Sequence, residues 1–200
     1  MFSHKLRKTT QTPQYTQQNS TPVLFKFTAL KPPPLQKPMP ILKPNTKNTL
    51  PKMIWGKHIW TFFHTMSQKI KPEYFHLIKN DFISFIVKIC NTLPCPICSQ
   101  HASEYMRSIN FHNIRSKEDF IQLFYVFHNT VNVRKNYEIF RQDQLSIYKH
   151  ANTVAVIKNF FVAYEDKTRA FKLMADDMSR LQIANEIKMW LNGNLQYFEP

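Results

Sequence analysis

The chain has 200 residues, of which 43% are hydrophobic and 14% aromatic, so it can bury a core in one principal domain. No apolar stretch approaches the roughly 20 residues of a membrane-spanning helix, and the N-terminus has neither the apolar region nor the cleavage site of a secretory signal. We therefore expect a soluble protein, and the sequence argues against an integral membrane or a secreted protein.

The positive charge is concentrated at the start of the chain. The first fifty residues hold eight Lys and Arg and no acidic residue, which is more than half of the net charge of +14. Most of the prolines also lie there, and they disfavour both helices and central strands. We predict that residues 1–51 form a disordered basic arm. Such an arm can contact nucleic acid, acidic membranes or acidic proteins, or serve only as a solubilising tail.

Helical periodicity begins at residue 52. Helices are predicted over about 53–70, 73–91, 95–107 and 117–135, with a short fifth helical turn over 145–149 and one or two helices over 150–192. Ser116, with Asp119 three residues later, is a helix N-cap signature. No strand pattern appears, so we predict an all-α protein: a domain over 52–149 and a helical C-terminal extension over 150–200. The apolar residues of the extension are Val154, Ile157, Phe160, Phe161, Phe171, Leu173 and Leu181.

Two of the three cysteines form Cys95-Pro96-Ile97-Cys98 at a predicted helix start. The pair is close enough for a disulfide, and the helix N-terminus stabilises its thiolate form. A zinc site is the alternative, since His101, His112 and His128 could add nitrogen ligands. A thioredoxin fold is excluded because no strands are predicted. The motif alone leaves redox chemistry and zinc binding open.

Polar and aromatic residues repeat on two other helices. Gly56, Trp60 and His64 fall at four-residue steps, and His128 and Asn132 lie one turn apart with Asn129 beside them. Such faces indicate a planar polar ligand, although each residue alone could be an ordinary half-exposed helix residue. With two glycines in the chain, a dinucleotide would need a helical, side-chain-built site. The candidate phosphate partners are Lys57, Arg134 and Lys135.

These motifs occur in a characteristic order. W-G-x-x-x-W-x-x-x-H from Trp55 to His64 precedes C-x-x-C with His101 beyond it, and H-N-x-V-N from His128 to Asn132 follows. The order resembles the Erv/ALR FAD-linked sulfhydryl oxidases, over Ile54 to Tyr148, and is closest to the short forms encoded by large cytoplasmic DNA viruses. The resemblance implies a four-helix bundle with a short fifth helix and FAD across its mouth.

The resemblance also implies roles for single residues. Cys95 and Cys98 would pass electrons from protein dithiols to FAD, and O2 would remove them as H2O2. The flavin nucleotide would contact Trp60, His64, His101, Tyr105, His128, Asn129, Val131 and Asn132, with Tyr148 near the adenine. The chain departs from the family pattern after Asn132, where Lys135 and Tyr137 replace a usual Leu and Lys.

Cys90 is the only other cysteine, whereas many members of the family carry an additional shuttle pair. It lies on the apolar flank of the second predicted helix, so we expect a buried core thiol instead of a redox partner. The electrons would then come directly from a substrate protein or from a separate thioredoxin-like carrier.

The sequence is also compatible with two other functional classes. One is a non-enzymatic basic module with zinc on Cys95, Cys98, His101 and another histidine, and with nucleic acid on the arm. The other is a virion or scaffold protein whose C-terminal helices form a partner or homodimer surface. The viral resemblance implies the host cytoplasm or a virion, and the acid-free N-terminus permits the mitochondrial intermembrane space as the alternative.

Overall fold

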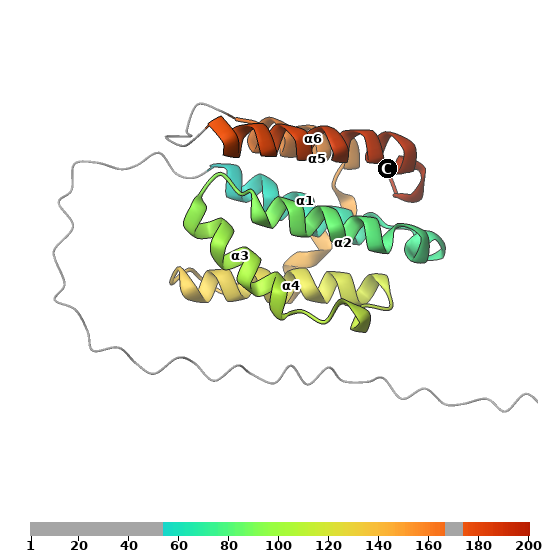
Figure 1. Ribbon diagram of the computed structural model, residues 1–200. Coiled ribbons are helices and arrows are strands. Elements are labelled where there is room, and N and C mark those ends of the chain that lie inside the picture. The colour runs from blue at the N-terminus through green and yellow to red at the C-terminus, as the bar shows by residue number, and fades with distance from the viewer. Residues whose placement is uncertain (1–53, 167–173) are drawn as a thin grey trace, which may run out of the picture. The chain divides into compact units, whose positions relative to one another are not determined.

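The computed structural model describes residues 54–166 and 174–200, and every regular element in them is helical (Figure 1). The predicted basic arm, Phe171 and Leu173 lie outside the described residues. The all-α prediction is confirmed. The α-helices are α1 Ile54–Lys69, α2 Phe75–Asn91, α3 Pro96–Ser108, α4 Lys117–Arg134, α5 Thr153–Tyr164 and α6 Met174–Asn194. The 3-10 helices are η1 Pro72–Tyr74, η2 Phe111–Asn113, η3 Gln142–His150 and η4 Leu195–Tyr197.

The helix boundaries follow the signals read in the sequence. The Asp119 amide donates to Ser116 Oγ at 3.2 Å, and the Ser116 amide donates to Asp119 Oδ2 at 2.9 Å, a complete capping box at the start of α4. The predicted turn at 145–149 extends to the nine residues of η3, because the Arg141 amide donates to Gln144 Oε1 and starts the helix earlier. No described helix has the length and apolarity needed to cross a membrane.

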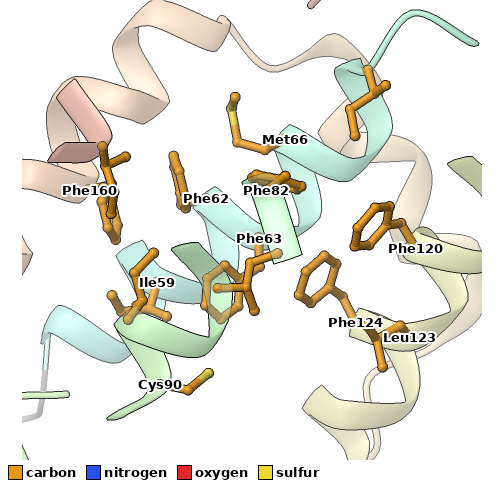
Figure 2. Packing of buried hydrophobic residues seen from close by; sticks show 14 of the residues in the cluster. Ile59, Phe62, Phe63, Met66, Phe82, Cys90, Phe120, Leu123, Phe124 and Phe160 are labelled. Atoms are coloured by element: carbon orange, nitrogen blue, oxygen red, sulfur yellow. The ribbon is translucent and has the colours of Figure 1, made fainter. Parts of the chain in front are cut away.

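Helix α1 lies at the centre of the packing and contacts α4, α5 and η3. The Phe63 ring stacks on Phe124 of α4 at 5.0 Å, and the Phe62 ring stacks on Phe160 of α5 at 4.0 Å. Figure 2 shows Phe62 and Phe160 on one side of this core and Phe120 and Phe124 on the other. The adjacent residues Phe62 and Phe63 of α1 therefore pack against two different helices, α5 and α4.

Helices α5 and α6 join the same hydrophobic core. Their residues in this core are Val156, Phe160, Phe161 and Tyr164 on α5, and Ala184, Ile187 and Leu191 on α6. Val154, predicted on the apolar face, is 60% exposed, because the buried face of α5 is set by Val156 and Phe160 instead. The core thus continues across residue 150, and the division into a domain and an extension stays a prediction.

The last described residues pack against the C-terminal end of α1 and the N-terminal end of α5. Phe198 is buried and forms an antiparallel bridge with Ile70. The Glu199 amide donates to Lys69 O at 2.7 Å, and Thr153 Oγ1 donates to Glu199 O at 2.6 Å. These bonds tie the start of α5 to the end of α1.

Candidate active site

The cysteine pair lies at the start of α3 and forms a disulfide with a Cα–Cα distance of 5.1 Å. Cys95 is the N-cap residue, in extended conformation, and Pro96 occupies the first helical turn, where a missing N–H costs nothing. The Cys98 amide points at Cys95 Sγ at 3.3 Å. Both cysteines are half-buried, and Ile97 between them is 68% exposed. The disulfide is therefore open to attack by another thiol.

Two serines of α3 attach the segment Cys95–Cys98 to the end of α2. Ser99 Oγ donates to Cys90 O at 2.9 Å, and Ser103 Oγ donates to Asn91 Oδ1 at 2.5 Å. Cys90 is fully buried and outside any disulfide, as predicted, and burial raises the pKa of its thiol. Cys90 is therefore a core residue whose backbone, and not its thiol, supports this segment.

A cluster of stacked rings forms between α1, α4 and η3. The Trp60 indole stacks on the His128 imidazole at 4.2 Å with an interplanar angle of 12°. His64 Nε2 and His128 Nδ1 are hydrogen-bonded at 3.0 Å, and His64 stacks on Tyr148 at 4.8 Å. We call Trp60, His64, His128 and Tyr148 the ring cluster. The sequence placed these four residues in one ligand site, and the structure brings them into contact.

Both histidines of the ring cluster are held in the neutral state. Burial, followed by the nearby His128, lowers the pKa of His64 to about 3, and burial lowers the pKa of His128 to about 4. In their mutual hydrogen bond one imidazole donates and the other accepts, which needs no charge. The cluster is therefore built of flat, uncharged rings, of which His64 is fully buried and Trp60, His128 and Tyr148 are half-buried.

The neutral histidines predict acid sensitivity. Each folded-state pKa lies below the unfolded value of about 6.5, so below that pH the unfolded chain binds protons that the folded chain does not. The free energy of unfolding should fall as the pH drops from about 6.5 towards 4, by on the order of 3 kcal/mol for each of the two histidines. Urea unfolding across this pH range measures it. His64→Gln should flatten the slope, whereas the exposed-residue control His76→Gln should not; equal slopes in all three proteins would contradict the assignment.

Asn129 and Asn132 are placed together, but their amides bind protein groups. Asn129 Oδ1 accepts from the Phe140 amide at 2.8 Å, and Asn129 Nδ2 donates to Phe140 O at 3.0 Å. Asn132 Nδ2 donates to Asn129 Oδ1 at 3.3 Å. This clamp holds the Phe140 ring against His128, at 5.0 Å, and against His64, at 5.3 Å. The turn that brings Phe140 back passes through Asn136, which has a φ of 54°.

A further pair of rings connects the ring cluster to the helix that carries the cysteines. Tyr105 of α3 stacks on Phe127 of α4 at 4.5 Å, and Phe127 lies edge-on to Trp60 at 5.0 Å. Burial raises the pKa of Tyr105 to about 12, so it remains protonated. Tyr105 therefore reaches the ring cluster indirectly, by stacking on Phe127, which contacts Trp60.

The remaining predicted residues lie on α1, on α3 and towards the end of α4. Gly56 is half-buried with open space where a side chain would begin, and Lys57 is exposed. Arg134 and Lys135 adjoin at the end of α4, and Lys135 lies over the Tyr137 ring at 5.9 Å. Val131 is half-buried against the core, and His101 is half-buried on α3.

Phe140 and Phe127 contact the ring cluster, although the sequence analysis did not predict them as site residues. Phe140 follows a stretch that departs from the family pattern, and only the clamp from Asn129 brings its ring into the site. Phe127 stands beside His128 and could have been inferred from the helical spacing that places it on the face of α4 towards Trp60.

Two polar atoms are consistent with a bound ligand. His64 Nδ1 and His101 Nδ1 are buried and have no hydrogen-bond partner in the structure, which is costly unless another group satisfies them. His64 Nδ1 lies among stacked aromatic rings, where such an atom fits a flat heteroaromatic group such as a flavin. By contrast, no group of three or more His, Cys, Asp or Glu in residues 54–166 and 174–200 is arranged to hold a metal ion. The zinc alternative therefore finds no ligand set there.

Comparison with known proteins agrees with these features. Residues 57–151 match the Erv1/Alr family. The chain is 32% identical to protein 347L of Invertebrate iridescent virus 6, a candidate FAD-linked sulfhydryl oxidase, over 40% of this chain and 78% of that protein. It is 29% identical to the FAD-linked sulfhydryl oxidase of African swine fever virus, over 54% of this chain and 92% of that protein. It is also 29% identical to FAD-linked sulfhydryl oxidase ERV1 of Arabidopsis thaliana, over 63% and 62%.

No solved structure shows significant similarity to the chain. The resemblance drawn from the motifs is confirmed by the family match and by these viral and plant relatives. The chain belongs to the Erv1/Alr family.

Proposed function

We propose that this protein is an FAD-dependent thiol oxidase that forms disulfides in protein dithiols and passes the electrons through Cys95–Cys98 and FAD to O2, giving H2O2. The observation that carries the proposal is a half-buried disulfide at the start of α3, in the same helical bundle as the ring cluster. The relatives that are named FAD-linked sulfhydryl oxidases support it.

The cysteines exchange a disulfide with the substrate. A substrate thiolate attacks Cys95 Sγ, a substrate–Cys95 bond forms, and the Cys95–Cys98 bond breaks with Cys98 leaving as a thiolate. The second substrate thiolate then attacks the mixed disulfide, and Cys95 leaves in turn. The substrate is oxidised and the pair is reduced by two electrons. The N-terminus of α3 and the Cys98 amide, aimed at Cys95 Sγ, both stabilise a thiolate on Cys95.

FAD, when bound, would accept two electrons from the dithiol and return them to O2. The ring cluster, with its neutral histidines, would hold the flat ring systems and keep charge and water away from them. The clamp from Asn129 would close the site with Phe140. We assign the other nucleotide contacts to Gly56, His101, Tyr105, Val131 and Asn132, and the phosphate contacts to Lys57, Arg134 and Lys135.

The source of electrons follows from the cysteine count. The chain has three cysteines, and Cys90 is buried, so we infer that electrons arrive from a protein dithiol substrate or a separate thioredoxin-like carrier. A homodimer, and contact of the basic arm with nucleic acid or acidic surfaces, complete the partners that we propose. By analogy with the viral relatives we place the protein in the host cytoplasm or a virion, and the plant relative keeps the intermembrane space as the alternative.

An absorption spectrum and an oxygen electrode test the proposal together. The purified chain should be yellow, with one non-covalent FAD, and should consume one O2 and release one H2O2 for each dithiol oxidised. A colourless protein that takes up zinc stoichiometrically would overturn the proposal. A yellow protein that does not oxidise dithiols would overturn the proposed oxidase activity, but it would support the assignment of FAD as the cofactor.

A further inference from the structure

Tyr164, the last residue of α5, lies beyond the family match and is fully buried. Its hydroxyl is 2.5 Å from Thr92 Oγ1. Thr92 ends α2 and stands two residues before the segment Cys95–Cys98. Helix α5 thus contacts the chain at Thr92, shortly before the cysteine pair.

The direction of this hydrogen bond follows from the partners of Thr92. The single hydroxyl hydrogen of Thr92 is donated to Lys88 O, at 2.8 Å, in the last turn of α2. Thr92 Oγ1 can therefore only accept from Tyr164, and Tyr164 is the donor. Burial is the main cause that raises the pKa of Tyr164 to about 12, so the proton is present throughout the neutral range.

Helix α6 keeps Tyr164 in place. The ion pair Lys188–Glu165 joins α6 to the residue after Tyr164, and Lys88 pairs with Glu186 at 2.7 Å to join α6 to the last turn of α2. The Tyr164 ring also stacks on Phe160 at 5.2 Å. The end of α2 is therefore bonded to α5 through Thr92 and to α6 through Lys88. It is also bonded to α3, through the hydrogen bond from Ser99.

We propose that Tyr164 is a positioning residue for the Cys95–Cys98 pair: through Thr92 it fixes the end of α2 and so the place at which Cys95 is presented to Cys98. The proposal rests on the proposed function in one respect, that this pair is the redox-active disulfide. The two C-terminal helices are then a working part of the oxidase, although they lie outside the region that matches the family.

Reduction of the pair by glutathione measures this role. Two glutathione thiols convert the disulfide into two cysteine thiols and one glutathione disulfide, so the ratio of the two protein forms gives an equilibrium constant. Tyr164→Phe removes one hydroxyl and leaves Thr92 bonded to Lys88. Without the brace, Cys95 samples positions away from Cys98, and the equilibrium should shift towards the dithiol by about threefold to tenfold, the range expected for one hydrogen bond.

Substitutions at Thr92 and at the far end of α5 provide the controls. Thr92→Ser keeps the accepting hydroxyl and should behave as the unchanged protein, whereas Thr92→Val should shift the equilibrium at least as far as Tyr164→Phe. The double variant should shift no further than Thr92→Val alone. Thr153→Val removes the hydroxyl that donates to Glu199 O, at the opposite end of the same helix, and should lower the melting temperature without moving the equilibrium.

The measurement is made anaerobically on the full chain, with thiols trapped by alkylation and counted by mass. An unchanged equilibrium in Tyr164→Phe and Thr92→Val, or an equal shift in Thr153→Val, would overturn the proposal. If Tyr164→Phe did not fold, Thr92→Val against Thr92→Ser decides the same question. The equilibrium does not depend on electrons reaching FAD, so failure of the proposed oxidase activity would be seen separately as absent O2 consumption.

Discussion

Replacing either Cys95 or Cys98 with Ser should lower dithiol oxidation by about a thousandfold or more, the scale expected when one member of a catalytic pair is removed. Neither variant can form the disulfide that accepts electrons from a substrate. Oxygen consumption with a small dithiol measures the loss. Because serine is nearly isosteric with cysteine, both variants should keep the α3 start and the bound FAD.

The third cysteine is the matched control for this loss. Cys90→Ala removes a buried thiol that forms no disulfide, so it should cost some stability through a small cavity and keep most of the turnover. The two active-site variants should also differ, since Cys98→Ser retains Cys95, whose thiolate should attack a disulfide of the oxidised substrate, displace one substrate thiolate and stay bound as a mixed disulfide. Trapping only in Cys95→Ser would reverse the assignment of the attacked sulfur, and normal turnover in either would exclude the disulfide from the mechanism.

Trp60→Ala should lower FAD retention by roughly tenfold or more, because Trp60 stacks on His128 and supports His64 and Phe127. Removing the indole opens the ring cluster and lets His128 turn away from His64. The ratio of flavin absorbance to protein absorbance after gel filtration measures retention. The dissociation constant follows from quenching of flavin fluorescence on titration with the FAD-free protein.

Trp190 is the matched control for general destabilisation. Its indole packs on Phe85 and Phe198 and donates to Asp81 Oδ2 at 3.0 Å, on α6 and away from the ring cluster. Trp190→Ala should lower the free energy of unfolding by about 2–4 kcal/mol and retain FAD. Equal loss of FAD in both variants would show that retention reports stability, and full retention in Trp60→Ala would exclude the ring cluster as the cofactor site.

The fold could be predicted well because its signals are local. The Ser116–Asp119 box and the prolines at the helix starts act through bonds within one turn of the chain. The contacts among Trp60, His64 and His128 were also foreseeable, since helical spacing places them on single faces. Periodicity and capping are enough where a residue's neighbours are close in sequence.

The parts that were missed depend on contacts between distant segments. Phe140 enters the site only because Asn129 binds its backbone across a turn with a positive φ at Asn136. The exposure of Val154 depends on which face of α5 meets α1, which spacing alone leaves ambiguous for a short, strongly apolar helix. The bond from Tyr164 to Thr92 spans 72 residues and leaves no local pattern.

Anaerobic titration of the yellow protein with a dithiol tests the central claim most directly, because it follows electrons from thiol to flavin without oxygen. One dithiol per chain should bleach the flavin absorbance in the unchanged protein, and neither Cys95→Ser nor Cys98→Ser should bleach at a comparable rate. Admitting O2 should restore the yellow colour and yield one H2O2 per flavin. Equally fast bleaching in the serine variants would contradict electron transfer through Cys95–Cys98, and so would the absence of bleaching in the unchanged protein.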